Sequence, residues 1–339
     1  MRQTWRSLSG VNTQFGGTLM RKRMKEEKKH YAQLHKNFWI ARGSLPFKQG
    51  IDYIYNMFAG KSMADVYNHP YLVEAEHWPE QPSPQMQLTE EVQSVLRIAK
   101  GMFREADRTS MLDNTMSIVR DPSSGRFLLY NPVDLELKTR EEIHQLLANG
   151  DVTDIVVPSR QTWQSLLLWT EKYPQATVWH AGSVPIETFA GKDIKLRYLP
   201  TGNTNTFEPN EDPIFPHCNF YQIPGDQITN EHVLFHDDAM TLSCTDLYHG
   251  PYTDYDPLNT WLCRFWFKQQ RLGDHKSKVF LPHFRKTQIE SQKAVRVVQE
   301  TVDLLTRVLP MEHLVFSHGT PPLSGLDAVT SLRAQYALK

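Results

Sequence analysis

The pattern of apolar and polar positions is clearest at residues 233–247, where two short apolar runs flank a polar turn. Residues 233–235 (VLF) form the first run and residues 241–244 (TLSC) the second, with Asp237 and Asp238 between them. β-Branched and aromatic residues on both sides of an Asp-containing turn are typical of a β-hairpin. The pattern therefore predicts two strands, and it places Asp246 at the C-terminal end of the second.

Strands and helices alternate through the C-terminal part of the chain. Residues 154–157 and 177–180 are apolar runs typical of buried strands, and the segment between them predicts a helix that Ser159 caps and Pro174 ends. This alternation indicates α/β layering. Further elements are expected as a hairpin at residues 116–130, a helix that ends near residue 308, a strand at 313–316 and a helix at 326–338.

The beginning of the chain lacks this regular pattern, and we expect an N-terminal extension at residues 1–88 followed by a folded domain at residues 89–339. Between residues 37 and 84 aromatic side chains are dense, and Pro and Gly interrupt the segment. Aromatic residues are enriched at protein–protein interfaces, so the segment suits an arm that docks onto partner subunits. It is also compatible with a segment that wraps its own domain and covers a sheet edge.

Composition narrows the class of protein. Hydrophobic residues make up 40% of the 339 positions and charged residues 22%, which supports a sizeable core. The three cysteines have no paired spacing, which argues against a disulfide framework and favours a reducing compartment. No apolar run reaches the roughly 18 residues of a transmembrane helix, so we expect no membrane span.

The net charge of −1 is unevenly distributed along the chain. Residues 1–36 contain nine Lys or Arg against two Glu. A basic end suits an arm that binds an anionic partner such as rRNA, and it also suits a solvated tail. Residues 1–19 contain Arg, Ser, Thr and Gly but no acidic residue, a composition that resembles a mitochondrial targeting signal, cleaved or retained. We therefore expect a mitochondrial protein.

Four blocks of sequence, in this order, resemble an uncharacterised family of metallo-β-lactamase-like proteins. They are residues 116–135 (MSIVRDPSSGRFLLYNPVDL), 154–179 (DIVVPSRQTWQSLLLWTEKYPQATVW), 233–247 (VLFHDDAMTLSCTDL) and 313–319 (HLVFSHG). Residues 1–110 lie outside the resemblance. What the resemblance implies is an α/β fold, the αββα sandwich of the metallo-β-lactamase type.

The metal ligands that the resemblance implies are mostly missing. Active members of the wider superfamily carry a His-x-His-x-Asp-His motif after a strand, with further His and Asp ligands for one or two metal ions. Here that loop falls at residues 158–163 (PSRQTW), which contain no His, Asp, Glu or Cys. Asp246 and His318 remain in register, with His236 nearby in the hairpin. Zinc requires three or four converging ligands, so we expect no bound metal, no other cofactor and no catalytic residue.

The three remaining positions also have structural interpretations. Asp246 would cap the turn that follows it or accept backbone N–H groups. His318 would hydrogen-bond Asp246, and His236 would be a half-buried strand residue.

Three functional hypotheses remain. The favoured one is a non-catalytic accessory subunit of a large mitochondrial assembly, a respiratory-chain complex, docked through residues 1–84. The second is a mitochondrial ribosomal protein whose basic arm contacts rRNA. The third is a metal-dependent hydrolase with a reduced site built on His236, Asp246 and His318. The near-neutral net charge favours the first over the second, because ribosomal proteins are commonly basic throughout.

Overall fold

The structure is a computed structural model that describes residues 31–47, 110–135, 137–159, 162–163, 165–181, 194–225, 230–250, 292–319, 321–336 and 338. The chain divides into two compact units. The smaller collects residues 1–28, 46–112 and 255–266, and the larger collects residues 29–45, 113–254 and 267–339. The elements below belong to the larger unit, apart from the ends of β2 and β3. The expected targeting signal, most of the expected docking arm and the start of the expected domain lie outside the described residues.

Seven strands form the first sheet, in the order β1-β2-β3-β4-β5-β6-β7. β1 pairs with β2 and β3 with β4 in antiparallel fashion, whereas β4, β5, β6 and β7 run parallel to their neighbours. The strands are β1 (Tyr31–His35), β2 (Phe38–Phe47), β3 (Ser110–Arg120), β4 (Phe127–Tyr130), β5 (Val152–Val157), β6 (Thr177–His180) and β7 (Lys195–Tyr198). β5 is buried almost throughout, as expected for an inner parallel strand.

Five strands form the second sheet, in the order β12-β11-β10-β9-β8. β8, β9 and β10 are antiparallel, β10 and β11 are parallel, and β12 closes the sheet antiparallel to β11. The strands are β8 (Cys218–Gln222), β9 (His232–His236), β10 (Thr241–His249), β11 (His313–His318) and β12 (Leu323–Ser324). The parallel pair brings the C-terminal ends of β10 and β11 to the same edge.

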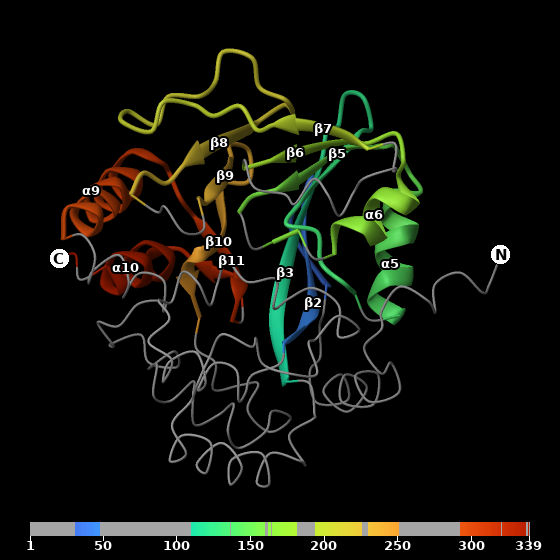
Figure 1. The fold of residues 1–339 in the computed structure, drawn as a ribbon, viewed down its shortest axis with the longest axis horizontal. Helices are drawn as coiled ribbons and strands as arrows, with labels where there is room; N and C mark the ends of the chain where they lie inside the picture. The colour runs from blue at the N-terminus through green and yellow to red at the C-terminus, as the bar shows by residue number, and fades with distance from the viewer. Residues whose placement is uncertain are drawn as a thin grey trace, which may run out of the picture. The chain divides into compact units, whose positions relative to one another are not determined.

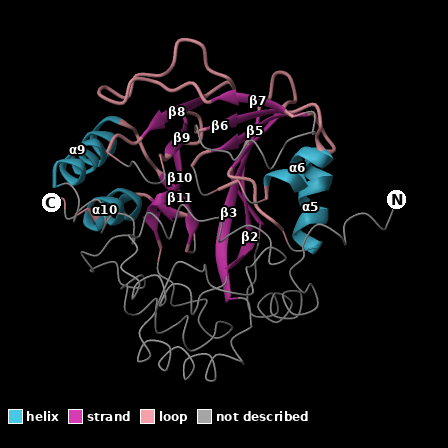
Figure 2. Ribbon diagram, viewed as in Figure 1, coloured by secondary structure: helices cyan, strands magenta, loops and turns pink. Residues whose placement is uncertain are grey.

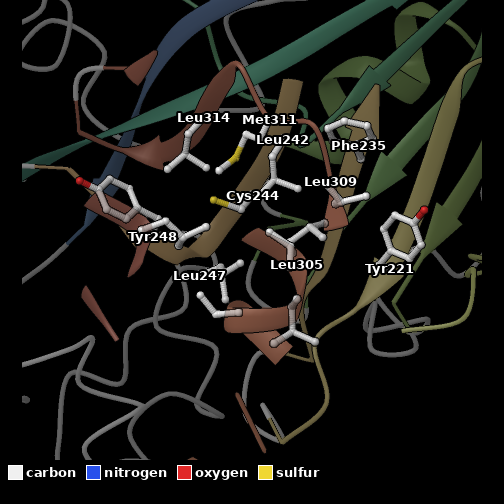
Figure 3. Close-up of a cluster of buried hydrophobic side chains, with 14 of the residues drawn as sticks. Tyr221, Phe235, Leu242, Cys244, Leu247, Tyr248, Leu305, Leu309, Met311 and Leu314 are labelled. Carbon is white, nitrogen blue, oxygen red and sulfur yellow. The ribbon is translucent and has the colours of Figure 1, made fainter. Parts of the chain in front are cut away.

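Three apolar clusters show how the layers stack. The first joins the outer face of the first sheet to α5 (Leu137–Leu147) and α6 (Leu166–Lys172), through residues such as Ile143 and Trp169. The second lies between the sheets and includes Leu128 and Leu234. The third joins the second sheet to α9 (Gln292–Val308) and α10 (Leu326–Gln335), and Figure 3 shows part of it. The larger unit is therefore an αββα sandwich, with one helix pair on each side of the two sheets (Figures 1 and 2).

The αββα sandwich expected from the resemblance is confirmed, and so is the hairpin at residues 233–247, now β9 and β10. Two local expectations differ. α6 begins at Leu166, with Ser165 at its N-cap, so Ser159 does not cap it; the Ser159 N–H instead donates to Thr162 Oγ1. Residues 31–47, which the sequence places in the extension, form β1 and β2 of the first sheet. Among the described residues, no helix is both long and apolar enough to cross a membrane.

Candidate functional site

The site lies where β10 and β11 end side by side. Their pairing runs in register from Thr241 to Cys244, which lies beside Phe316, and is then interrupted. Pairing resumes with His249 directly beside His318. Between the two paired positions β10 therefore contains more residues than β11 does. Such an irregularity bends a strand and redirects its side chains. Here it turns the carboxylate of Asp246 back towards the two histidines.

Asp246, His249 and His318 form a compact cluster of metal-ligand types. Asp246 Oδ1 lies 3.2 Å from His249 Nε2 and 3.6 Å from His318 Nε2. The two imidazole rings are 4.7 Å apart between centroids and inclined at 61°. One ligand atom from each residue lies within 4.8 Å of the other two. Their side chains are only 8–11% exposed, so the cluster is nearly enclosed.

Two glycines allow the strand ends to approach this closely. His249 and His318 are each followed by glycine, and the Gly250 N–H donates to the His318 carbonyl at 2.8 Å. A Cβ on Gly250 would lie 2.5 Å from a ring carbon of Phe316, and one on Gly319 would lie 2.6 Å from the Gly250 Cα. Gly319 also has φ +124, which L side chains rarely adopt. The two His-Gly pairs therefore set the spacing of the imidazoles.

A buried carboxylate fixes the backbone beneath the cluster. Glu231 is 1% exposed, and its two oxygens accept the backbone N–H groups of Thr245 and Asp246. Burial raises the pKa of the Tyr130 hydroxyl well above its usual value, and the nearby charge of Glu231 raises it further, with smaller contributions from Cys244 and Asp246. The Glu231 carboxylate thus lies against the backbone of Asp246, and carboxylates beside a site favour a bound cation.

The C-terminal end of α10, with its C-cap Tyr336, forms hydrogen bonds to the irregular part of β10. The Tyr336 hydroxyl donates to the Leu247 carbonyl at 2.6 Å, and the His249 N–H donates to Gln335 Oε1 at 3.4 Å. These bonds satisfy backbone groups that an unbroken ladder would otherwise pair. The position of His249 is therefore built into the fold rather than left to a free loop end.

The structure brings together two of the three positions singled out from the sequence. Asp246 and His318 meet, but His236 does not join them, because it pairs with Thr241 at the opposite end of β10. His236 is 1% exposed and its Nδ1 accepts the Ala239 N–H. The third member is instead His249, which sequence reasoning missed. One signal in the sequence could have identified it. His249 lies three residues after Asp246 and is followed by glycine, as His318 is.

The loop after β5 adds no ligand to the cluster. The Pro158 carbonyl accepts the N–H of His232, next to Glu231, so the loop borders the same end of the sandwich. Residues 158–163 contain no His, Asp, Glu or Cys. Two imidazoles and one carboxylate are donors that zinc and iron accept in proteins, so the chemistry of the cluster fits one such ion. Within the part of the chain that the structure describes, the cluster does not supply the ligands for two ions.

Comparison with known proteins gives fold-level likenesses alone. No protein-family model matches the chain, and no curated protein matches its sequence. Among solved structures, a metallo-β-lactamase from Hirschia baltica has a TM-score of 0.46 at 8% identity, over 90% of this chain and 96% of that one. One from Erythrobacter litoralis has a TM-score of 0.45 at 8% identity, over 94% and 99%. The mono-zinc form of FIM-1 from Pseudomonas aeruginosa has a TM-score of 0.41 at 10% identity, over 68% and 85%. Function is therefore argued from the site's own residues.

Proposed function

We propose that this chain is a non-catalytic structural subunit of a large mitochondrial assembly, a respiratory-chain complex. The observation that carries the proposal is the loop at residues 158–163, which holds no metal-ligating side chain where the resembling enzymes keep their principal motif. Without those ligands the sandwich keeps its packing but loses the multi-metal centre that activates water. A fold retained without that centre supports a scaffolding role.

The N-terminal composition supports the mitochondrial part of the proposal. Residues 1–19 lack acidic side chains, and residues 1–36 carry nine Lys or Arg. Such a segment suits import and then contact with acidic partner surfaces. The net charge of −1 supports a protein complex rather than a ribosome as the host.

A single-metal hydrolase is the second candidate, because His249 joins Asp246 and His318 in one cluster. A divalent ion held there would supply Lewis-acid character and lower the pKa of a water molecule. The chain's own residues would hold the ion and exclude bulk water. This candidate predicts a hydrolytic activity that Asp246→Ala abolishes, whereas a scaffold retains its assembly behaviour in that variant.

The test is the native size of the tagged, full-length protein released gently from mitochondria, with and without ribonuclease. We expect a very large particle that depends on detergent and resists ribonuclease. A large particle that ribonuclease breaks down would replace the respiratory complex with a ribosome. Migration near the 39.3 kDa mass of one chain would contradict the scaffolding proposal altogether.

A further inference from the structure

We infer that Asp246, His249 and His318 bind a single divalent transition-metal ion of the zinc or iron class. The ligand set differs from the pattern that the resemblance implies, because it gains His249 and lacks the whole motif after β5. The inference does not depend on the role in an assembly, since a metal ion can stabilise a scaffold or serve an enzyme.

The distances fit the edges of a metal coordination polyhedron. Two ligands bound at about 2.0–2.1 Å with a tetrahedral angle lie about 3.3–3.4 Å apart. Asp246 Oδ1 lies 3.2 Å from His249 Nε2 and 3.6 Å from His318 Nε2, on either side of that value. Both imidazoles turn the same nitrogen, Nε2, towards the same carboxylate oxygen.

The contacts within the cluster combine one hydrogen bond with one longer approach. The 3.2 Å contact from His249 qualifies as a hydrogen bond, but the 3.6 Å contact from His318 is too long. The centroids of the two imidazole rings lie 4.7 Å apart, with one ring inclined edge-on to the other, and one nitrogen of each ring lies near the Asp246 carboxylate. A cation between the three converging donors accounts for the convergence of all three side chains.

The surrounding structure is what a preorganised site requires. Glu231 holds the backbone of Asp246, and α10 holds the backbone of Leu247 and His249. Residues that orient metal ligands from outside typically change metal affinity about 10–100-fold when they are replaced. With the three ligands that the described residues supply, the ion would keep one open position for water or for an oxygen- or nitrogen-donor ligand.

The test uses the full-length protein, stripped with a chelator and titrated calorimetrically with Zn²⁺, with Co²⁺ as a spectroscopic substitute. We expect the wild type to bind one equivalent that His249→Ala and His318→Ala both lose or bind at least about tenfold more weakly. His313→Ala is the matched control, because His313 lies at the other end of β11 and its Nδ1 contacts Ser324 Oγ. That variant is expected to bind like the wild type.

Folding is checked separately by circular dichroism and thermal unfolding in chelator. Glu231→Gln provides a second test of the site. It leaves all three ligands in place but removes one of the two oxygens that accept the backbone N–H groups of Thr245 and Asp246. We expect it to weaken Zn²⁺ binding about 10–100-fold. Folded His249→Ala and His318→Ala proteins that bind the same number of ions with unchanged affinity would overturn the inference. So would a wild type that binds no Zn²⁺ or Co²⁺.

Discussion

His236 is a buried histidine whose position makes the stability of the fold depend on pH. Its pKa is lowered to about 4, chiefly by burial; nearby Asp238 opposes this shift, and His35 and His217 add to it. Its Nδ1 also accepts the Ala239 N–H, which requires that nitrogen to be unprotonated. The folded state therefore binds the proton less readily than the unfolded chain, whose histidine has a pKa near 6.5. The contribution of this histidine to the free energy of unfolding is complete above about pH 6.5 and is lost as the pH falls towards 4.

We expect this single group to account for a loss on the order of 3 kcal/mol across that interval. The measurement is the free energy of unfolding by denaturant between pH 7 and pH 4, for the wild type and for His236→Asn. The Asn side chain can still accept the Ala239 N–H but does not titrate. The difference between the two curves should shrink as the pH falls, and a constant difference would show that His236 is not the titrating group.

At the same scale, the sequence predicted two members of the Asp246–His249–His318 cluster and missed the third. Asp246 and His318 could be found because each follows an apolar strand pattern at a position where the resembling proteins keep a ligand. His249 could not be placed, because its approach to His318 depends on the break in pairing after Cys244. A register shift of this kind is set by tertiary contacts, here from Glu231 and α10, so the His-Gly pair at residues 249–250 marks a candidate but does not show that His249 meets His318.

Among the elements, a substitution in β2 can test whether residues 31–47 belong to the sandwich. Phe38 is 0% exposed and packs in the cluster between the two sheets. Phe38→Ala should lower the free energy of unfolding by roughly 3–5 kcal/mol, because the cavity lies between layers that cannot close over it. Tyr198→Ala is the control, since Tyr198 lies on the edge strand β7 and is 75% exposed, and it should cost less than about 0.5 kcal/mol. Equal losses in the two variants, measured by denaturant unfolding, would place Phe38 outside the core.

The elements found from the sequence are those whose own pattern reports burial. β5 and β6 are short apolar runs, α9 carries an apolar stripe, and all three were expected close to their observed ends. β1 and β2 were not found, because their aromatic and polar residues alternate poorly and β2 itself contains Gly43 and Pro46. Pairing within the first sheet decides their structure, and such pairing overrides weak local preference. The start of α6 shows the converse, because the expected N-cap, Ser159, lies six residues before the observed one, Ser165.

For the whole molecule, the two strands β1 and β2 change how a docking arm should be tested. Removing residues 1–84 would take two strands out of the first sheet, so lost assembly would report unfolding as well as lost docking. Removing residues 1–28 instead deletes seven of the nine Lys or Arg in residues 1–36 and leaves the larger unit, which begins at residue 29, complete. Because this deletion also removes the expected targeting signal, both the truncated and the full-length protein should carry the same heterologous, cleavable mitochondrial presequence.

We expect the truncated protein to enter mitochondria and to keep the circular dichroism spectrum of a folded αββα sandwich, but to leave the large particle for the position of a single chain. A full-length variant with Gln at five basic positions distinguishes the effect of the arm's charge from that of its other residues. The positions are Arg21, Lys22, Arg23, Lys25 and Lys28. If that variant also leaves the particle, acidic partner surfaces hold the arm through its charge, and docking should weaken as salt is raised. If it stays while the truncated protein leaves, the contact is made by the uncharged residues. Truncated protein that remains in the particle would show that the sandwich itself docks, and would shift the interface to surfaces such as the exposed edge strand β7.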